Sequence, residues 1–153
     1  MTRSSISPVV KPPEYKFQKL DVYQLGIEFV DDVYGLTSQL PESERFNLRS
    51  QLERAATSIV LNIAERSTGQ TDLEQNRFLG MALRSYLEVA CMDLIERRKY
   101  LTVGAIDSAR HLGHQVFVKL QALRRALTKR PVSGPQSLGL NLKHYTRERK
   151  STV

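Results

Sequence analysis

Apolar residues recur at spacings of three and four through four segments of the sequence, and this period limits the fold more than any other feature. Such spacing places the side chains on one face of an α-helix, whereas a half-buried strand alternates them every second residue. The helices are expected at residues 19–39, 42–66, 71–98 and 102–129, and no strand pattern competes with them. Because the connections are short, the sequence predicts an all-α, antiparallel up-and-down four-helix bundle.

The helix ends carry their own signals. Pro41 can begin a helix but not continue one. Thr71 and Glu74 form a capping box, and Thr102 can cap the last helix. The expected buried stripes comprise Leu20, Tyr23, Ile27, Val30, Tyr34 and Leu36 or Val33; Phe46, Leu48, Leu52, Ala55, Ala56, Ile59 and Ile63; Phe78, Met81, Ala82, Ser85, Leu87 or Val89, Met92 and Ile95; and Ile106, Ala109, Leu112, Val116, Phe117, Leu120, Leu123 and Leu127.

A chain of 153 residues suits one domain. We expect a flexible N-terminal arm at residues 1–14, the bundle at residues 15–130, and a linker with a basic tail at residues 131–153. The longest uncharged apolar stretch, around SIVLNIA, is too short for a membrane span, and the N-terminus lacks the apolar core of a secretory signal. The single cysteine, Cys91, excludes an internal disulfide framework, so the cytoplasm is the expected compartment.

The net charge of +7 comes from the ends of the chain. Residues 14–128 carry fifteen basic and fifteen acidic side chains, so the expected bundle is neutral in total. Within it, residues 14–40 sum to −3 and residues 102–128 to +3, which makes the fourth helix the basic one. Because basic arms on a neutral body are typical of polyanion binding, this helix and the tail could form one anion-binding strip. A merely solubilising tail remains an alternative.

The stretch RAATSIVLNIAE places polar residues beside the apolar stripe of the second helix. Arg54, Ser58, Asn62 and Glu65 stack on one side of that helix. A nucleophilic role for Ser58 lacks a histidine or lysine at helical spacing. A packing role needs only partners across an interface: Asn62 can donate and accept, and Arg54 can bind a carboxylate such as Glu65 or Glu88 of a neighbouring helix or subunit.

The longer run ERFNLRSQLERAATSIVLNIAE resembles the signature of the four-helix bundle proteins of intervening sequences in bacterial large-subunit ribosomal RNA genes. YKFQKLDVYQLGIEFVDDVYGLT resembles the first helix of that family, and FLGMALRSYLEV its third, so the resemblance covers about residues 15–125. The family includes the accessory variability determinant (Avd) proteins of diversity-generating retroelements. The chain departs from the family pattern at Arg66, where a glycine is usual, and in its added basic tail.

The resemblance implies a homo-oligomer, commonly a ring of five copies. It also implies binding of nucleic acid, RNA or an RNA/DNA hybrid, and of a reverse transcriptase through a basic exterior. By this resemblance, Arg54, Ser58, Asn62 and Glu65 are fold and assembly residues.

The sequence does not favour enzyme activity or a bound cofactor. The glycines are scattered and form no phosphate-binding loop. Asp107, His111 and His114 can share a helix face, but three ligands on one helix leave a metal site open, so we expect no metal there. Cys91 lies among apolar residues, which favours an inert, buried side chain.

The candidate nucleic-acid-binding residues lie on the fourth helix and in the tail. Tyr145 can stack on an unpaired base while the neighbouring cations follow the phosphate backbone. The full set is Arg110, Lys119, Arg124, Arg125, Lys129, Arg130, Lys143, Tyr145, Arg147, Arg149 and Lys150. The sequence therefore predicts a non-enzymatic nucleic-acid-binding scaffold; a protein interaction module with no direct nucleic-acid role is the alternative.

Overall fold

The computed structural model describes residues 11–69, 71–87 and 89–129, apart from the Leu87 side chain. Within these ranges every regular element is helical and there is no strand. The α-helices are α1 (Asp21–Thr37), α2 (Ser50–Arg66), α3 (Asp72–Leu87), α4 (Ala90–Arg97) and α5 (Asp107–Thr128). Short 3-10 turns lie at Lys16–Lys19 and Glu42–Glu44, and a π-helical turn at Arg45–Arg49.

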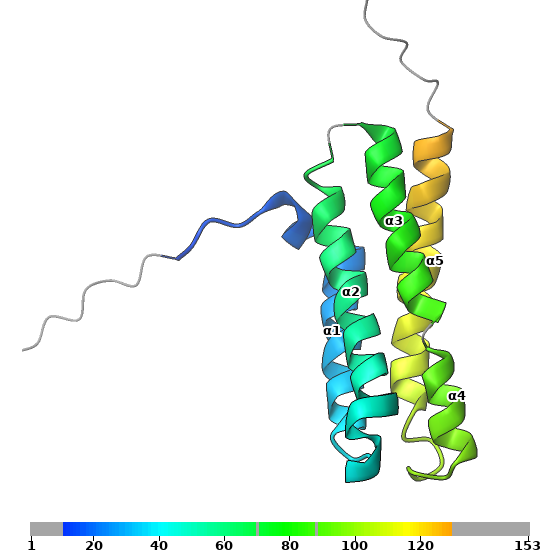
Figure 1. Ribbon diagram of the computed structural model, residues 1–153. Helices are drawn as coiled ribbons and strands as arrows, with labels where there is room; N and C mark the ends of the chain where they lie inside the picture. Colours follow the sequence, from blue (N-terminus) through cyan, green and yellow to red (C-terminus); the bar gives the residue numbers. More distant parts are fainter. Residues whose placement is uncertain (1–10, 70, 88, 130–153) are drawn as a thin grey trace, which may run out of the picture.

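The helices run up and down in a single bundle (Figure 1). α1 descends, α2 ascends, α3 and α4 descend one after the other, and α5 ascends beside them. α1 packs against α2 and α5, and α3 packs against the same two helices. The bundle therefore has four sides, named here by the helices that border them: α1/α2, α2/α3, α3/α5 and α5/α1.

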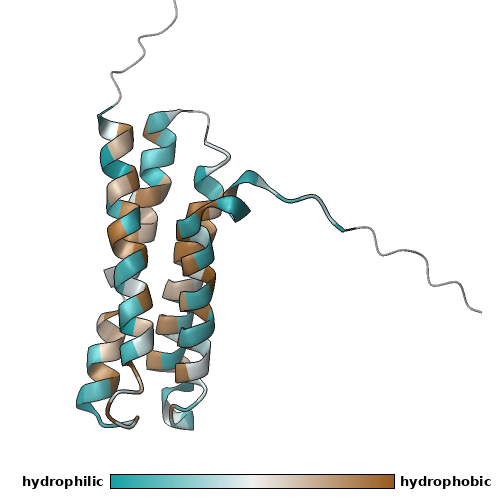
Figure 2. Cartoon of the chain, turned by 180° about the vertical axis from the view of Figure 1, so that it is seen from behind, coloured by the Kyte–Doolittle hydropathy of each residue, from teal (hydrophilic) through white to brown (hydrophobic). Residues whose placement is uncertain are grey.

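The core is a continuous apolar cluster to which α1, α2, α3, α4 and α5 all contribute. Phe29, Leu52 and Leu120 are among its most deeply buried side chains. Figure 2 shows apolar and polar stretches alternating along each helix, as one-sided burial requires. Cys91 belongs to this cluster, so the expectation that it is buried is confirmed.

α5 approaches α1 and α3 closely at Gly113. A Cβ atom at this position would lie 3.0 Å from Phe29 Cε2 and 3.1 Å from Tyr86 Cε2. Both contacts come from aromatic rings in a packed interior, which cannot move without disturbing their neighbours. A residue larger than glycine at position 113 would therefore push α5 away from the core.

The third expected helix is divided. Residues 71–98 were expected to form one helix, but α3 ends at Leu87 and α4 begins at Ala90. Near the break, the Val89 N–H donates to the Tyr86 carbonyl (2.9 Å) and the Met92 N–H to the Val89 carbonyl (2.8 Å), which is the shorter three-residue pattern. The apolar stripe continues across the break, because Met92 and Ile95 are fully buried, and so the period could not reveal it.

The second helix begins later than expected. Residues 42–44 form the 3-10 turn and residues 45–49 the π-helical turn, where an α-helix was expected. The backbone of Asn47 (φ −121°, ψ −107°) is not helical. Phe46 therefore leaves the expected stripe and is 87% exposed, so its assignment to the core was wrong. Ile27, Tyr34 and Met81 were also expected in their stripes but lie at the surface.

Glu44 holds this irregular segment to the rest of the bundle. Its carboxylate accepts hydrogen bonds from the Tyr100 hydroxyl (2.8 Å), from the Asn47 side-chain amide (3.0 Å) and from the Leu48 N–H (3.4 Å). The Tyr100 bond contributes most to a lowered pKa of Glu44, because each of these bonds favours the charged carboxylate. The Glu44–Tyr100 hydrogen bond thus connects the turns between α1 and α2 to the loop between α4 and α5.

The last helix also differs at its start. Thr102 was expected to cap it, but α5 begins at Asp107 with Ile106 at the N-cap position and no side-chain cap. Gly104 has a φ of +86°, a left-handed conformation that interrupts a right-handed helix at this point. One half of the capping box expected at Thr71 and Glu74 is observed, since the Glu74 N–H donates to Thr71 Oγ1 (3.1 Å).

The described helices run from Lys16 to Thr128, within the range expected for the bundle, residues 15–130. Most of the expected arm, residues 1–10, and the whole tail, residues 131–153, lie outside the described residues. None of the helices described is both long enough and apolar enough to cross a membrane.

We predict that Gly113→Val lowers the free energy of unfolding by about 1–3 kcal/mol, because the added methyl groups meet the Phe29 and Tyr86 rings. Gly35→Ala is the matched control, since nothing lies within 4 Å of a Cβ at that helical position. It should leave stability unchanged or raise it slightly. Urea unfolding at one fixed protein concentration measures both; equal stability of the two variants would contradict the close approach.

We predict that Glu44 contributes stability that depends on pH. Its pKa is lower in the folded chain than its ordinary value, so the contribution is full above that ordinary value and is lost as pH falls through the folded pKa. Glu44→Gln should lower the Tm near neutral pH, and the difference from wild type should shrink in acid. Thermal unfolding followed by circular dichroism across this range measures it; Tyr100→Phe should show the same trend, and a pH-independent difference would refute it.

Candidate nucleic-acid interface

Arg124 of α5 lies across α3. Its Nε donates to Asn76 Oδ1 (2.9 Å), and a Cβ at Gly80 would be 3.7 Å from its Cζ. The guanidinium therefore lies over α3 at Gly80, at a distance where a methyl group would make ordinary van der Waals contact with it. A planar guanidinium held in one place can bind a phosphate through two parallel hydrogen bonds, at a lower entropic cost than a freely moving side chain.

Two arginines of α3 flank this point. Arg77, Gly80 and Arg84 follow one another at spacings of three and four, so they form a single stripe along α3. Both arginines are exposed, and neither forms an ion pair with a described residue. Arg125 and Lys129 are also exposed at the end of α5. We call the set Arg77, Arg84, Arg124, Arg125 and Lys129 the basic surface.

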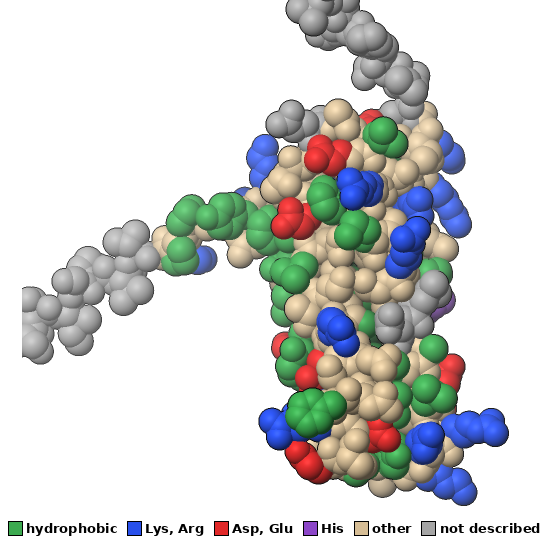
Figure 3. All heavy atoms as spheres, in the orientation of Figure 1, with side chains coloured by type: hydrophobic (Ala, Val, Ile, Leu, Met, Phe, Trp, Pro, Cys, Tyr) green, Lys and Arg blue, Asp and Glu red, His purple; other side chains and the backbone are tan. Residues whose placement is uncertain are grey.

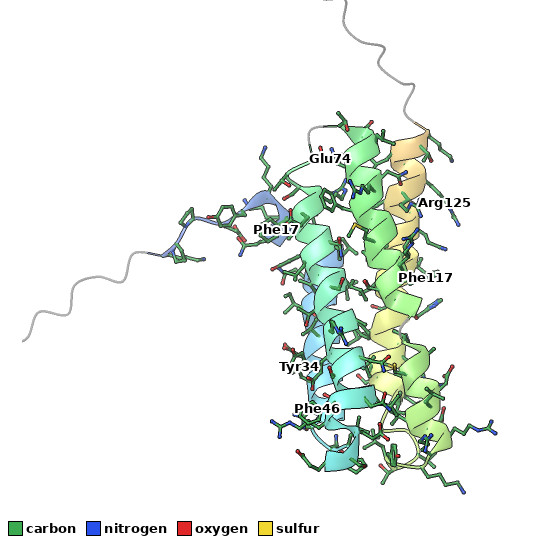
Figure 4. All side chains as sticks on the ribbon, viewed as in Figure 1. Phe17, Tyr34, Phe46, Glu74, Phe117 and Arg125 are labelled. Atoms are coloured by element: carbon green, nitrogen blue, oxygen red, sulfur yellow. The ribbon has the colours of Figure 1, made fainter. Side chains whose placement is uncertain are left out.

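Figure 3 shows Lys and Arg side chains gathered over the upper half of α3 and α5. Figure 4 places Arg125 on the outer side of α5 in the same region. Below it, the rings of Tyr86 and Phe117 stack with centroids 4.8 Å apart and join α3 to α5. Burial raises the pKa of Tyr86, because it disfavours the charged form of the hydroxyl.

The candidate residues of α5 contact different helices of the bundle. Arg124 contacts α3, Arg125 lies on the outer side of α5, and both belong to the basic surface. Arg110 turns to α4 instead, where its Nη2 lies 2.7 Å from Asp93 and 2.8 Å from Glu96. Lys119 turns to α1 and lies 3.9 Å from Asp21. The charges of Arg110 and Lys119 are therefore compensated within the bundle.

The remaining candidates lie in or next to the tail. Lys129 is the last described residue, and it continues the basic surface beyond the end of α5. The other members, Arg130, Lys143, Tyr145, Arg147, Arg149 and Lys150, lie outside the described residues.

The histidines of α5 do not form a metal site with described residues. His111 contacts its own helix neighbour Gln115 through Nε2 (2.8 Å), and His114 is exposed. Among residues 11–69, 71–87 and 89–129, no three His, Cys, Asp or Glu side chains come together as metal ligands.

The four polar residues of the α2 motif fall into two groups, one hydrogen-bonded and one exposed. Asn62 is buried, and its amide donates to the Ser58 carbonyl (2.8 Å) and to Ser58 Oγ (3.2 Å). Ser85 of α3 donates to the same Ser58 Oγ (2.9 Å), so this half of the motif joins two helices. Arg54 and Glu65 are both exposed, and the expected Arg54–Glu65 bond is absent from the described contacts. The alternative partner, Glu88, lies outside the described residues.

Sequence reasoning missed Arg77 and Arg84, because the expected basic strip was confined to the fourth helix. Their seven-residue separation was a usable signal, since two turns of helix bring both onto one side. Their alignment with Arg124 was not predictable from spacing, because it depends on how α3 and α5 pack.

A family model described as 23S rRNA-intervening sequence protein matches residues 18–122, more than half of the chain. The chain belongs to this family. The match includes α1, α2, α3 and α4 and most of α5, and it ends before Arg124, Arg125 and Lys129.

A solved structure supports the same fold. A protein of unknown function from the S23 ribosomal protein family of Bacteroides thetaiotaomicron is 24% identical, with a TM-score of 0.63. The similarity covers 68% of this chain and 98% of that one, so the shared part is the bundle. A search of curated proteins gives no match.

Proposed function

We propose that this protein is a non-enzymatic scaffold that binds RNA or an RNA/DNA hybrid through the basic surface and the tail. The observation that carries the proposal is the convergence of arginines from α3 and α5 on one side of the bundle. They have no described acidic partner, whereas Arg110 and Lys119 do. Uncompensated cations on one side are the expected electrostatic pattern of a phosphate-binding surface.

The order of charges along the chain supports the same proposal. α5 ends at Thr128, next to Arg125, and the residues that follow include the basic cluster KHYTRERK. A tail that leaves the bundle beside Arg125 and Lys129 can extend the phosphate contacts made there. Tyr145 would then stack on an unpaired base, which favours single-stranded or looped RNA.

We further propose that the working form is a cytoplasmic homo-oligomer, a ring of five copies, that assists a reverse transcriptase of a retroelement. The resemblance of three separated motifs to the family that includes the Avd proteins supports this role. In it, the reverse transcriptase carries out the chemistry and the ring holds template RNA near it. Several copies of a weak binding surface would bind tightly through avidity.

The experiment measures binding of a structured RNA at several salt concentrations. We predict that the double variant Arg84→Gln/Arg125→Gln binds about tenfold more weakly and shows a flatter salt dependence, by about 0.7 to 1 in slope for each phosphate that the protein no longer neutralises. A chain ending at Thr128 should lose affinity and slope in the same way.

The matched control is Arg97→Gln/Lys99→Gln, which removes two exposed charges at the opposite end of the bundle. It should bind RNA as wild type does. Equal binding by wild type, the basic-surface variant and the truncated chain would overturn the assignment of these residues. If no form binds RNA while the protein captures one specific polypeptide, the interaction module is the better description.

A further inference from the structure

The most exposed large aromatic side chain of the described bundle is Phe46, in the irregular turn before α2. It is 87% exposed, and Tyr34 of α1 is 48% exposed nearby. Figure 4 shows both near the lower end of α1 and α2, away from Arg125. The guanidinium of Arg45 lies 5.3 Å from the centroid of the Phe46 ring. Exposed aromatic rings beside an arginine are typical of protein interfaces rather than of free surface.

Two surface hollows meet at Phe46 and Arg54. The first, of about 480 Å³, lies on the α1/α2 side and also includes Tyr34. The second, of about 380 Å³, lies on the α2/α3 side and reaches Ser58 and Ser85. Small residues in the second hollow allow close approach of another backbone. Because both hollows share Phe46 and Arg54, they form one continuous surface across α2, which we call the α2 groove.

One arginine of the α2 groove keeps an uncompensated charge. Arg45, Arg49 and Arg54 line the groove together with one acid, Glu53, and Arg45 is paired with Glu42 (3.1 Å). Glu53 is already engaged by Arg49 (3.2 Å) and by the Thr37 hydroxyl (2.6 Å). Arg54 forms no ion pair with a described residue, so it is available to an incoming carboxylate.

The complementary charges lie on α1 of the same chain. Gln24, Glu28, Asp31 and Gly35 recur at spacings of four, three and four, and all are exposed, so they form one outward stripe. Neither Glu28 nor Asp31 forms an ion pair with a described residue. No atom lies within 4 Å of the position that a Cβ on Gly35 would occupy, so the surface at that end of the stripe has no protruding side chain. We call it the α1 acidic stripe.

We infer that the α2 groove of one copy binds the α1 acidic stripe of a neighbouring copy. This inference rests on the homo-oligomer of the proposed function and names the surfaces that form it. Arg54 would bind Glu28 or Asp31 of the neighbour, and Phe46 and Tyr34 would be covered by its α1. Such a contact joins two different surfaces, and it therefore closes into a ring when the rotation between copies allows it.

The arrangement of the bundle agrees with this contact. The groove borders the α1/α2 and α2/α3 sides, and the stripe lies on the outer side of α1, so the two surfaces are distinct but adjacent. Neither surface uses the α3/α5 side. The basic surface thus stays open to nucleic acid in the assembled form.

The experiment measures the mass of the full chain in solution by sedimentation velocity. We predict that Arg54→Glu and Phe46→Ala each shift the wild-type oligomer to monomer or raise its dissociation constant at least tenfold. Glu28→Arg/Asp31→Arg should do the same. Combining Arg54→Glu with Glu28→Arg/Asp31→Arg exchanges the charges of both surfaces and should restore the oligomer.

Matched controls separate this contact from general surface effects. Arg97→Glu reverses an exposed charge on α4, and Leu94→Ala removes a side chain that is 47% exposed on the same helix. Both should keep the wild-type mass. Circular dichroism identifies variants that do not fold; if Arg54→Glu is one of them, Phe46→Ala and the stripe variant still provide the test.

The outcomes distinguish this inference from the proposed function. An oligomer unaffected by groove and stripe variants would overturn the docking surfaces and leave the scaffold standing. A monomeric wild-type chain would overturn both the docking surfaces and the ring, and RNA binding would then be judged by itself. Loss of RNA binding by Phe46→Ala with the mass unchanged would show that the α2 groove binds nucleic acid, which also overturns the inference.

Discussion

The close approach of α5 to α1 and α3 at Gly113 is the constraint on which the other features depend. With no side chain at Gly113, the Phe29 and Tyr86 rings reach within about 3 Å of where a Cβ would be. That contact sets the separation of α3 and α5. Phe117 can then stack on Tyr86, and Arg124 can reach across Gly80 to Asn76. The basic surface is therefore a consequence of helix packing, since its residues come from two helices held at this distance.

Charge in this bundle is sorted by side rather than by helix. α5 was expected to be one basic face, yet Arg110 is bound by two carboxylates of α4 and Lys119 lies near Asp21 of α1. Exposed pairs of this kind add little stability, but they cancel the local potential. The described cations without an ion pair include Arg77, Arg84, Arg124 and Arg125 along α3 and α5, Arg54 in the α2 groove, and Arg97 and Lys99 at the end of α4. We propose that the cations along α3 and α5 bind phosphate and that Arg54 in the α2 groove binds a carboxylate of a neighbouring copy.

Residues with regular local surroundings were predictable, and those at irregular turns were not. Ser58 has the partner across a helix interface that was expected of it, because the spacing of residues along a helix fixes which side they share, whereas the described bonds of Asn62 stay within α2. The position of Phe46 was wrong, because the backbone at Asn47 leaves the helix and rotates the preceding side chain away from the stripe. The division between α3 and α4 was missed for a related reason. A three-residue hydrogen-bond pattern at Val89 interrupts the helix without interrupting its apolar stripe.

The sequence by itself determined the all-helical fold, the number of helical rods, most of their buried stripes and the family, because helical period and local motifs are properties of neighbouring residues. Only the tertiary structure decided which charges are free. Whether Arg110, Arg124 or Arg54 keeps an uncompensated charge depends on the carboxylates and amides that other helices place beside it. The positions of those groups follow from how the helices pack, at glycines and aromatic rings that are far apart in the chain. The exposure of Phe46 beside Arg54 was likewise decided by the tertiary structure. It depends on the conformation of a turn in which Glu44 accepts a hydrogen bond from Tyr100, a residue distant in the chain.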